Sequence, residues 1–127
     1  MLRGFYRCFI ESILTFSFIC WFGGLSVQNK NVLGRVVNVC GKVVGEKMKS
    51  LNELYECRVV KKARNIQNDA THILARNYDV LPSGRRLRVP RFSTVRGRKS
   101  FVPMSVSLLY HIQSSSAVLV VLNRGVC

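Results

Sequence analysis

A long basic segment without acidic residues most constrains how this chain can fold. It runs from residue 81 to residue 103 and reads LPSGRRLRVPRFSTVRGRKSFVP. Its seven cations are Arg85, Arg86, Arg88, Arg91, Arg96, Arg98 and Lys99. Burying so many unpaired charges is too costly, and Pro82 and Pro90, with two glycines, disfavour a continuous helix. The segment is therefore expected to form an irregular basic arm on the surface of a folded body.

The charge balance of the whole chain points to an anionic partner. The 127 residues include 20 Lys and Arg against 6 Asp and Glu, for a formal net charge of +14. All the acidic residues lie before residue 80, so none follows the start of the arm. Arginine suits phosphate because its planar guanidinium donates two parallel hydrogen bonds. The arm is predicted to bind the backbone of RNA or DNA; the alternative is that its charge serves only solubility.

The predicted nucleic-acid-binding residues are the seven cations and two aromatic residues of the arm. Phe92 and Phe101 could stack on bases, or they could dock the arm onto the helices. Outside the arm, Lys61, Lys62 and Arg64 form a candidate second patch.

The N-terminal apolar segment is predicted to be a buried, central helix. Between residues 4 and 22, apolar side chains recur at helical spacing, at Phe5, Phe9, Ile13, Phe16 and Cys20. The uncharged run, residues 12–25, is 14 residues long, whereas a bilayer needs about 20. A signal peptide or anchor is the alternative, although Trp21 and Phe22 replace the small residues of a cleavage site.

Capping signals predict the next two helices. Ser26 is a candidate N-cap of a valine-rich helix that ends at Gly45. Ser50 and Glu53 have the spacing of a capping box at the start of a third helix. The residues expected to face inward from the third helix are Leu51, Leu54, Tyr55, Val59, Ala63 and Ile66.

The expected fold class is all-α: a small bundle of three main helices plus one or two short helices, with an irregular basic arm and a loose C-terminal tail. The predicted boundaries are 3–79 for the helical body, 80–102 for the arm, 103–112 for a short helix and 113–127 for a disordered tail. Within the body, Asp69 is expected to cap a short helix over residues 70–78.

No catalytic or metal-binding constellation is predicted, so the chain is expected to be neither an enzyme nor a cofactor-binding protein. Ile73 and Leu74 follow His72, where a two-histidine, one-carboxylate iron site needs a carboxylate. Asp69 and Asp79 have no second acid beside them for two-metal chemistry. The five irregularly spaced cysteines are expected to be buried, reduced thiols of an intracellular protein, nuclear or cytoplasmic.

Most of the chain also resembles one family. It is similar to the C-terminal tail of the reverse transcriptase polyprotein of non-LTR retrotransposons of fish and other vertebrates. The segments that carry the resemblance are FYRCFIESILTFSFICWFGGLS (5–26), NKNVLGRVVNVCGKVVG (29–45), SLNELYECRVVKKARNIQNDATH (50–72), LPSGRRLRVPR (81–91) and SFVPMSVSLL (100–109). The resemblance departs at Tyr110 and His111, where the family has Asn, and does not extend over residues 113–127.

This resemblance implies a non-catalytic fragment that follows the polymerase domain of a longer polyprotein. The missing polymerase domain would then be a partner, whereas no small-molecule substrate and no membrane partner are expected. The paired aspartates of a reverse transcriptase have no counterpart here, so polymerase activity is not carried over. The family's tail is thought to assist nucleic-acid engagement.

The opening helical region also resembles a short domain named after the N-terminal region of the eighth AlkB homologue, a tRNA-modifying protein. That resemblance implies an accessory role in 2-oxoglutarate-dependent dioxygenase or methyltransferase chemistry. The iron triad and the glycine loop for S-adenosylmethionine are missing from the sequence, so this role is only an alternative.

Overall fold

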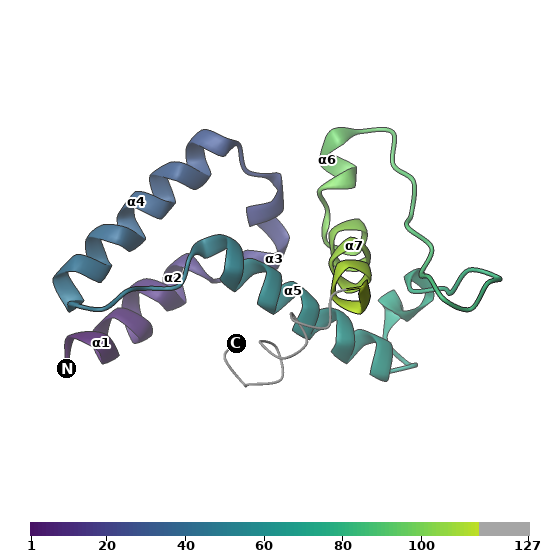
Figure 1. The fold of residues 1–127 in the computed structure, drawn as a ribbon, viewed down its shortest axis with the longest axis horizontal. Coiled ribbons are helices and arrows are strands. Elements are labelled where there is room, and N and C mark those ends of the chain that lie inside the picture. Colours follow the sequence, from purple (N-terminus) through teal and green to yellow (C-terminus); the bar gives the residue numbers. More distant parts are fainter. Residues whose placement is uncertain (115–127) are drawn as a thin grey trace. The chain divides into compact units, whose positions relative to one another are not determined.

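The computed structural model describes residues 1–114, and within them the fold is all-α, as predicted, with no strand beyond one isolated bridge between Val80 and Leu87. In chain order the elements are α1 (Leu2–Phe5), the π-helix η1 (Tyr6–Glu11), α2 (Ser12–Leu14), α3 (Phe18–Trp21), the 3-10 helix η2 (Phe22–Gly24), α4 (Val27–Val44), α5 (Leu51–Asn68), the 3-10 helix η3 (Ile73–Asn77), α6 (Val95–Arg98) and α7 (Phe101–Ser114) (Figure 1).

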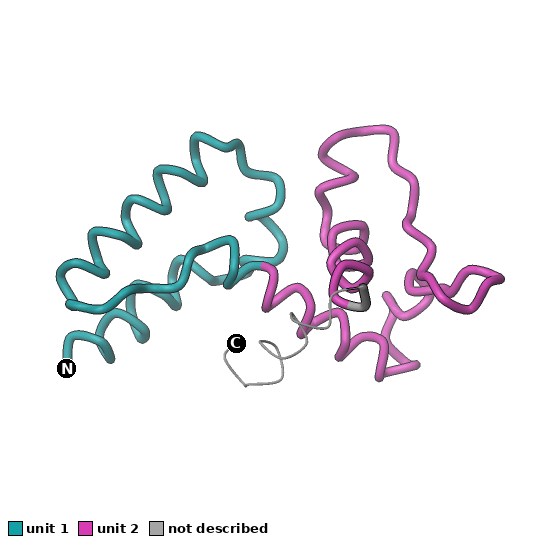
Figure 2. The backbone as a smooth tube through the Cα atoms, viewed as in Figure 1, with its two compact units in different colours: residues 1–55 teal, residues 56–127 magenta. Residues whose placement is uncertain are grey.

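The chain divides into two compact units, and each is described by itself (Figure 2). The first unit is Met1–Tyr55 and the second begins at Glu56, so the boundary falls within α5. The predicted boundaries of the helical body, the arm and the short helix do not coincide with these two units. That division stays a prediction. The predicted tail lies outside the described residues, except that α7 continues to Ser114.

The N-terminal segment is helical but not the continuous helix that was predicted. The Ser12 and Thr15 hydroxyls donate to the carbonyls of Cys8 and Glu11, four residues earlier, a contact that often bends helices. Ser17 then adopts a left-handed conformation with φ of 47°. Around this residue the backbone bonds change to a three-residue spacing, since the Phe16 amide donates to the Ile13 carbonyl and the Phe18 amide to the Thr15 carbonyl, each at 3.3 Å.

The prediction of a buried, central segment is wrong for the face that was expected to point inward, although Phe18 and Phe22 of the same segment are buried. The face expected inside is exposed, with 55% of Phe5, 57% of Phe9, 72% of Ile13 and 76% of Phe16 accessible to solvent. By length and composition, Leu2–Gly24 is also apolar enough to cross a membrane, with a mean hydropathy of 1.3; core helices and signal sequences share these properties. An exposed aromatic face of this kind typically marks a surface that binds something else.

Aromatic side chains form the centre of the first unit. Phe18 and Phe22 are each 1% exposed, and their ring centroids lie 5.7 and 5.1 Å from that of Tyr55. Val37 is the only valine of α4 that is buried; the other valines of this helix are exposed or half-buried. The first unit therefore has a small core and a large accessible apolar surface.

The predicted caps of α4 and α5 are present. The Ser26 hydroxyl accepts from the Asn29 amide at 3.3 Å, and the Ser50 hydroxyl accepts from the Glu53 amide at 3.2 Å. Gly45 ends α4 with φ of 77°, a left-handed conformation that glycine adopts without a Cβ penalty.

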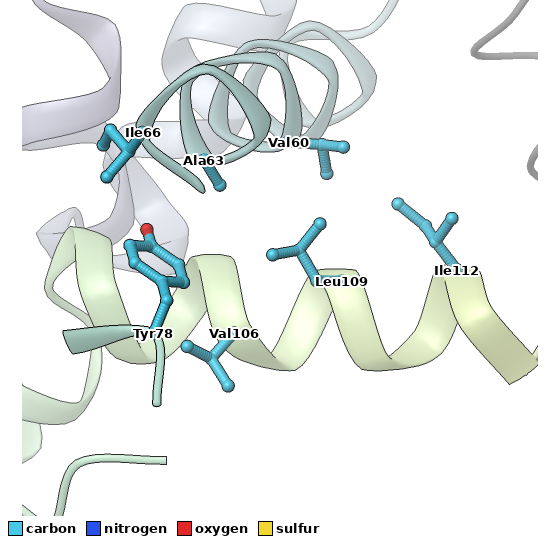
Figure 3. Packing of buried hydrophobic residues seen from close by; sticks show 7 residues of the cluster. All are labelled: Val60, Ala63, Ile66, Tyr78, Val106, Leu109 and Ile112. Carbon is cyan, nitrogen blue, oxygen red and sulfur yellow. The ribbon is translucent and has the colours of Figure 1, made fainter. Parts of the chain in front are cut away.

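A hydrophobic cluster shared by α5, Tyr78 and α7 forms the core of the second unit (Figure 3). Its members are Val60, Ala63, Ile66, Tyr78, Val106, Leu109 and Ile112. The predicted inward face of α5 is confirmed at Leu51, Tyr55, Val59, Ala63 and Ile66, whereas Leu54 is half-buried. The core thus fixes α7 against α5 and places the arm between two anchored points.

Tyr78 also makes a buried polar contact with α7. Its hydroxyl lies 2.7 Å from the Ser105 hydroxyl, which itself donates to the Val102 carbonyl at 2.7 Å. Either hydroxyl can be the donor in the bond between Tyr78 and Ser105. Burial raises the pKa of Tyr78, and the Ser105 contact opposes that rise.

The buried tyrosines Tyr55 and Tyr78 differ in whether their hydroxyl groups are hydrogen-bonded, and this difference can be tested by removing each hydroxyl. Tyr55 is 4% exposed, and its hydroxyl has no hydrogen-bond partner among residues 1–114, whereas the Tyr78 hydroxyl has one. Tyr55→Phe is expected to raise the free energy of unfolding by up to about 1 kcal/mol, and Tyr78→Phe to lower it by about 0.5–1.5 kcal/mol. Urea denaturation followed by circular dichroism measures both; the same sign for the two variants would contradict the assignment.

Several local predictions need correction. The predicted helix over residues 70–78 is the shorter η3, capped by His72 and not by Asp69, because the His72 Nδ1 accepts from the Leu74 amide at 3.1 Å. The Asp69 carboxylate instead accepts from the Thr71 amide and hydroxyl, bonds that lower its pKa. The last helix begins at Phe101, two residues before the predicted Pro103.

The expectation of buried, reduced cysteines is wrong in part. Cys8 and Cys20 are free but exposed, and Cys40 is free and half-buried. Cys57 is disulfide-bonded.

Candidate nucleic-acid interface

The arm begins with a tight reverse turn. The Leu81 amide donates to the Arg86 carbonyl at 2.7 Å, and the Arg88 amide donates to the Asp79 carbonyl at 2.8 Å. Gly84, within the turn, has φ of 67°, a conformation that a side chain would strain. The Pro-Ser-Gly sequence closes a hydrogen-bonded turn, and up to residue 94 the arm has no regular secondary structure beyond the single bridge at Leu87.

The returning strand-like segment separates apolar from charged side chains. Leu87 is half-buried and packs against the core cluster of the second unit. Arg86 and Arg88, its neighbours on either side, are exposed. Successive side chains of extended backbone point to opposite faces, so the anchored leucine directs both guanidinium groups outward.

The second half of the arm contains the short helix α6, which the sequence did not predict. The Thr94 hydroxyl caps it by accepting from the Gly97 amide at 3.1 Å. A Cβ on Gly97 would lie 2.9 Å from the Cβ of Phe92, so only glycine allows Phe92 to pack there. The glycine that was expected to prevent a helix instead makes room for a side chain beside one.

The seven cations are all exposed, and they lie in different parts of the arm. Arg85 lies in the turn, whereas Arg96 and Arg98 lie in α6 with Lys99 at its end. Within residues 1–114, no carboxylate forms an ion pair with any of the seven, whereas Arg3 pairs with Glu46 at 3.1 Å in the first unit. The charges of the arm are thus not neutralised by the carboxylates of the described chain.

The two phenylalanines of the arm pack against the protein. Phe101 is half-buried against the core cluster, and Phe92 lies against Gly97 with 42% of its surface exposed. The Phe92 carbonyl also accepts from the Arg98 Nε at 3.2 Å. These contacts favour the docking role over base stacking, most clearly for Phe101.

An open groove of about 750 Å³ lies between the first half of the arm and α7. Its charged and aromatic lining consists of Arg86, Arg88, Arg91, Tyr110 and His111. The Arg86 guanidinium carbon lies 5.1 Å from the centre of the Tyr110 ring, within the range of a cation–π contact. Three of the predicted cations are therefore brought together beside an aromatic ring.

Tyr110 and His111 were not among the predicted site residues. Both are exposed, and they follow Leu109, which is buried in the core. The sequence indicates part of this arrangement, because helical spacing from Val106 and Leu109 places Tyr110 at the edge of the apolar face. The same spacing does not show that the arm lies beside Tyr110.

The candidate second patch is less open than predicted. Lys61 and Lys62 of α5 are exposed, but Arg64 is half-buried. No group of three or more His, Cys, Asp or Glu side chains within residues 1–114 could hold a metal ion.

Comparison of the chain with protein-family models, curated proteins and solved structures finds no match. The function is therefore inferred from the charge and geometry of the second unit.

Proposed function

We propose that this chain is a non-catalytic module that binds nucleic acid through its basic arm. The observation that carries the proposal is the set of seven exposed cations without an ion-paired carboxylate among the described residues. Seven like charges on one short segment repel one another, and a polyanion relieves that repulsion. The resemblance to the tail of a retrotransposon reverse transcriptase supports the same role.

The arm is anchored at both ends, which favours binding by a partly ordered surface. Leu87 packs on the core near the start of the arm, and Phe101 packs on it at the end. The cations between them need not be ordered from a free chain when the ligand binds, so less entropy is lost. The anchored arm can follow a flexible phosphate backbone over several nucleotides.

A titration with backbone analogues tests this function. Fluorescence anisotropy would measure binding of a labelled single-stranded oligonucleotide and of an uncharged methylphosphonate strand of the same sequence and length. The phosphate strand is expected to bind and the uncharged strand to bind at least about tenfold more weakly, because charge-assisted bonds to phosphate are lost. Equal affinities would exclude phosphate recognition by the arm.

The exposed face of the N-terminal segment favours a second candidate function. Phe5 and Phe9 stack on each other with centroids 4.9 Å apart, and Ile13 and Phe16 continue the exposed apolar row. We propose that this face packs against the polymerase domain of a parent polyprotein. A surface of this kind is expected to be adhesive when the partner is missing.

Removing two of these aromatic rings tests the second candidate. The protein alone is expected to self-associate in gel filtration, and the double variant Phe9→Ser, Phe16→Ser to elute as a monomer, because both side chains are more than half exposed. Val43→Ser, at another exposed apolar position, is the control and should leave the association unchanged. A monomeric wild-type protein, or capture of the wild type by lipid vesicles, would count against packing on a protein partner.

A further inference from the structure

We propose that the groove between the arm and α7 holds one base of a single-stranded nucleic acid, stacked against the Arg86–Tyr110 pair. This inference rests on the proposed function and names the form of nucleic acid that the site selects. It assigns a binding role to Tyr110, a residue outside the arm.

The shape of the groove fits a flat ligand. Its volume of about 750 Å³ falls within the range of small-molecule sites, about 300–1,000 Å³. Leu87, Pro90 and Val106 contribute apolar lining, whereas Arg88 and Arg91 contribute charge. A nucleotide has the same division, since its base is flat and weakly polar and its phosphate is anionic.

The Arg86–Tyr110 pair supplies the stacking surface. The Tyr110 side chain is 42% exposed, and the Arg86 guanidinium lies over its ring at 5.1 Å. Bases of single strands stack on aromatic rings and on arginine planes, and the pair offers both in one place. Arg88 and Arg91, on the same groove, are then placed for the phosphates that flank the base.

The arrangement favours a single strand over a duplex. Within a duplex, each base is stacked between its neighbours, so its face is not available to a protein. A base on a single strand can turn into the groove while the backbone stays on the cations. The cations alone give no such selectivity, because both forms present phosphates.

A comparison of strands with and without bases tests the inference. Anisotropy titrations would use a short oligodeoxyadenylate and an abasic strand of the same length and charge. The wild-type protein is expected to bind the base-bearing strand between about fivefold and about a hundredfold more tightly, the range found for one stacked base. Tyr110→Ala should abolish this preference, whereas Tyr110→Phe, which retains the ring, should preserve it.

The outcomes separate this inference from the proposed function. Equal wild-type affinities for the two strands, or an undiminished preference in a folded Tyr110→Ala protein, would overturn the stacking site and leave phosphate binding intact. Absence of wild-type binding to either strand would overturn both. Circular dichroism of each variant establishes that it is folded.

Discussion

Replacing the seven cations of the arm with glutamine is expected to reduce the affinity for single-stranded nucleic acid by at least about a hundredfold. Hydrogen bonds to charged groups contribute about 1.5–3 kcal/mol each, so the loss of even two phosphate contacts reaches this size. The fold should persist, because no ion pair within residues 1–114 involves these side chains. Anisotropy titration measures the affinity, and circular dichroism reports the fold.

A charge-matched control distinguishes the effect of the arm on binding affinity from the effect of the net charge of the chain. Arg85→Gln, Arg88→Gln, Arg91→Gln removes three positive charges from the arm. Arg35→Gln, Lys42→Gln, Lys47→Gln removes three exposed positive charges from the first unit. The arm variant should lose at least about tenfold in affinity and the other variant far less, because only the former removes phosphate contacts. Similar losses in both would show that overall charge, and not the arm, governs binding.

Truncation of one buried isoleucine is expected to destabilise the second unit by about 2–5 kcal/mol. Ile66 is 1% exposed in the core cluster, so Ile66→Ala removes buried methyl groups and leaves a cavity. Ile73→Ala makes the same chemical change at a position that is 88% exposed, where the effect should stay within about 0.5 kcal/mol.

Urea denaturation monitored by circular dichroism compares these two isoleucine variants. Because domains of this size are stabilised by only about 5–15 kcal/mol, Ile66→Ala should shift the midpoint strongly, and Ile73→Ala very little. Equal midpoints would contradict the packing of α5 against α7. Nucleic-acid binding by Ile73→Ala should match that of the wild type.

The sequence predicted the fold best where the determinants are local. The Ser26, Gly45 and Ser50 caps depend on residues within a few positions, and all three are present. The inward face of α5 was also predicted almost completely, because its apolar residues lie on one side and its charges on the other. Local chemistry and amphipathic spacing agree in that helix.

In the N-terminal segment, the helical spacing of apolar residues is not enough to predict burial. Helical spacing identified the row from Phe5 to Phe16 but could not tell whether any part of the chain covers it. The break near Ser17 lies where the backbone bonds change from a four-residue to a three-residue spacing, a change that the apolar pattern does not indicate. Burial and continuity of a helix are properties of its surroundings as well as of its sequence.

The sequence identified most residues of the candidate site but not how they are arranged in space. The cations of the arm were identified because they fall within one short stretch that has no acidic residue. The groove was missed because Arg86 and Tyr110, which face each other, are separated by the rest of the arm and most of α7. Only the turn at Gly84 and the anchoring of Leu87 bring them together.

The salt dependence of single-strand binding tests the central claim most directly. If the arm neutralises about five phosphates, the logarithm of the association constant should fall with the logarithm of salt concentration at a slope of about −3.5. Between about 50 and 200 mM salt, that slope weakens binding by about a hundredfold. A slope near zero would contradict the claim that the guanidinium groups of the arm hold a polyanion.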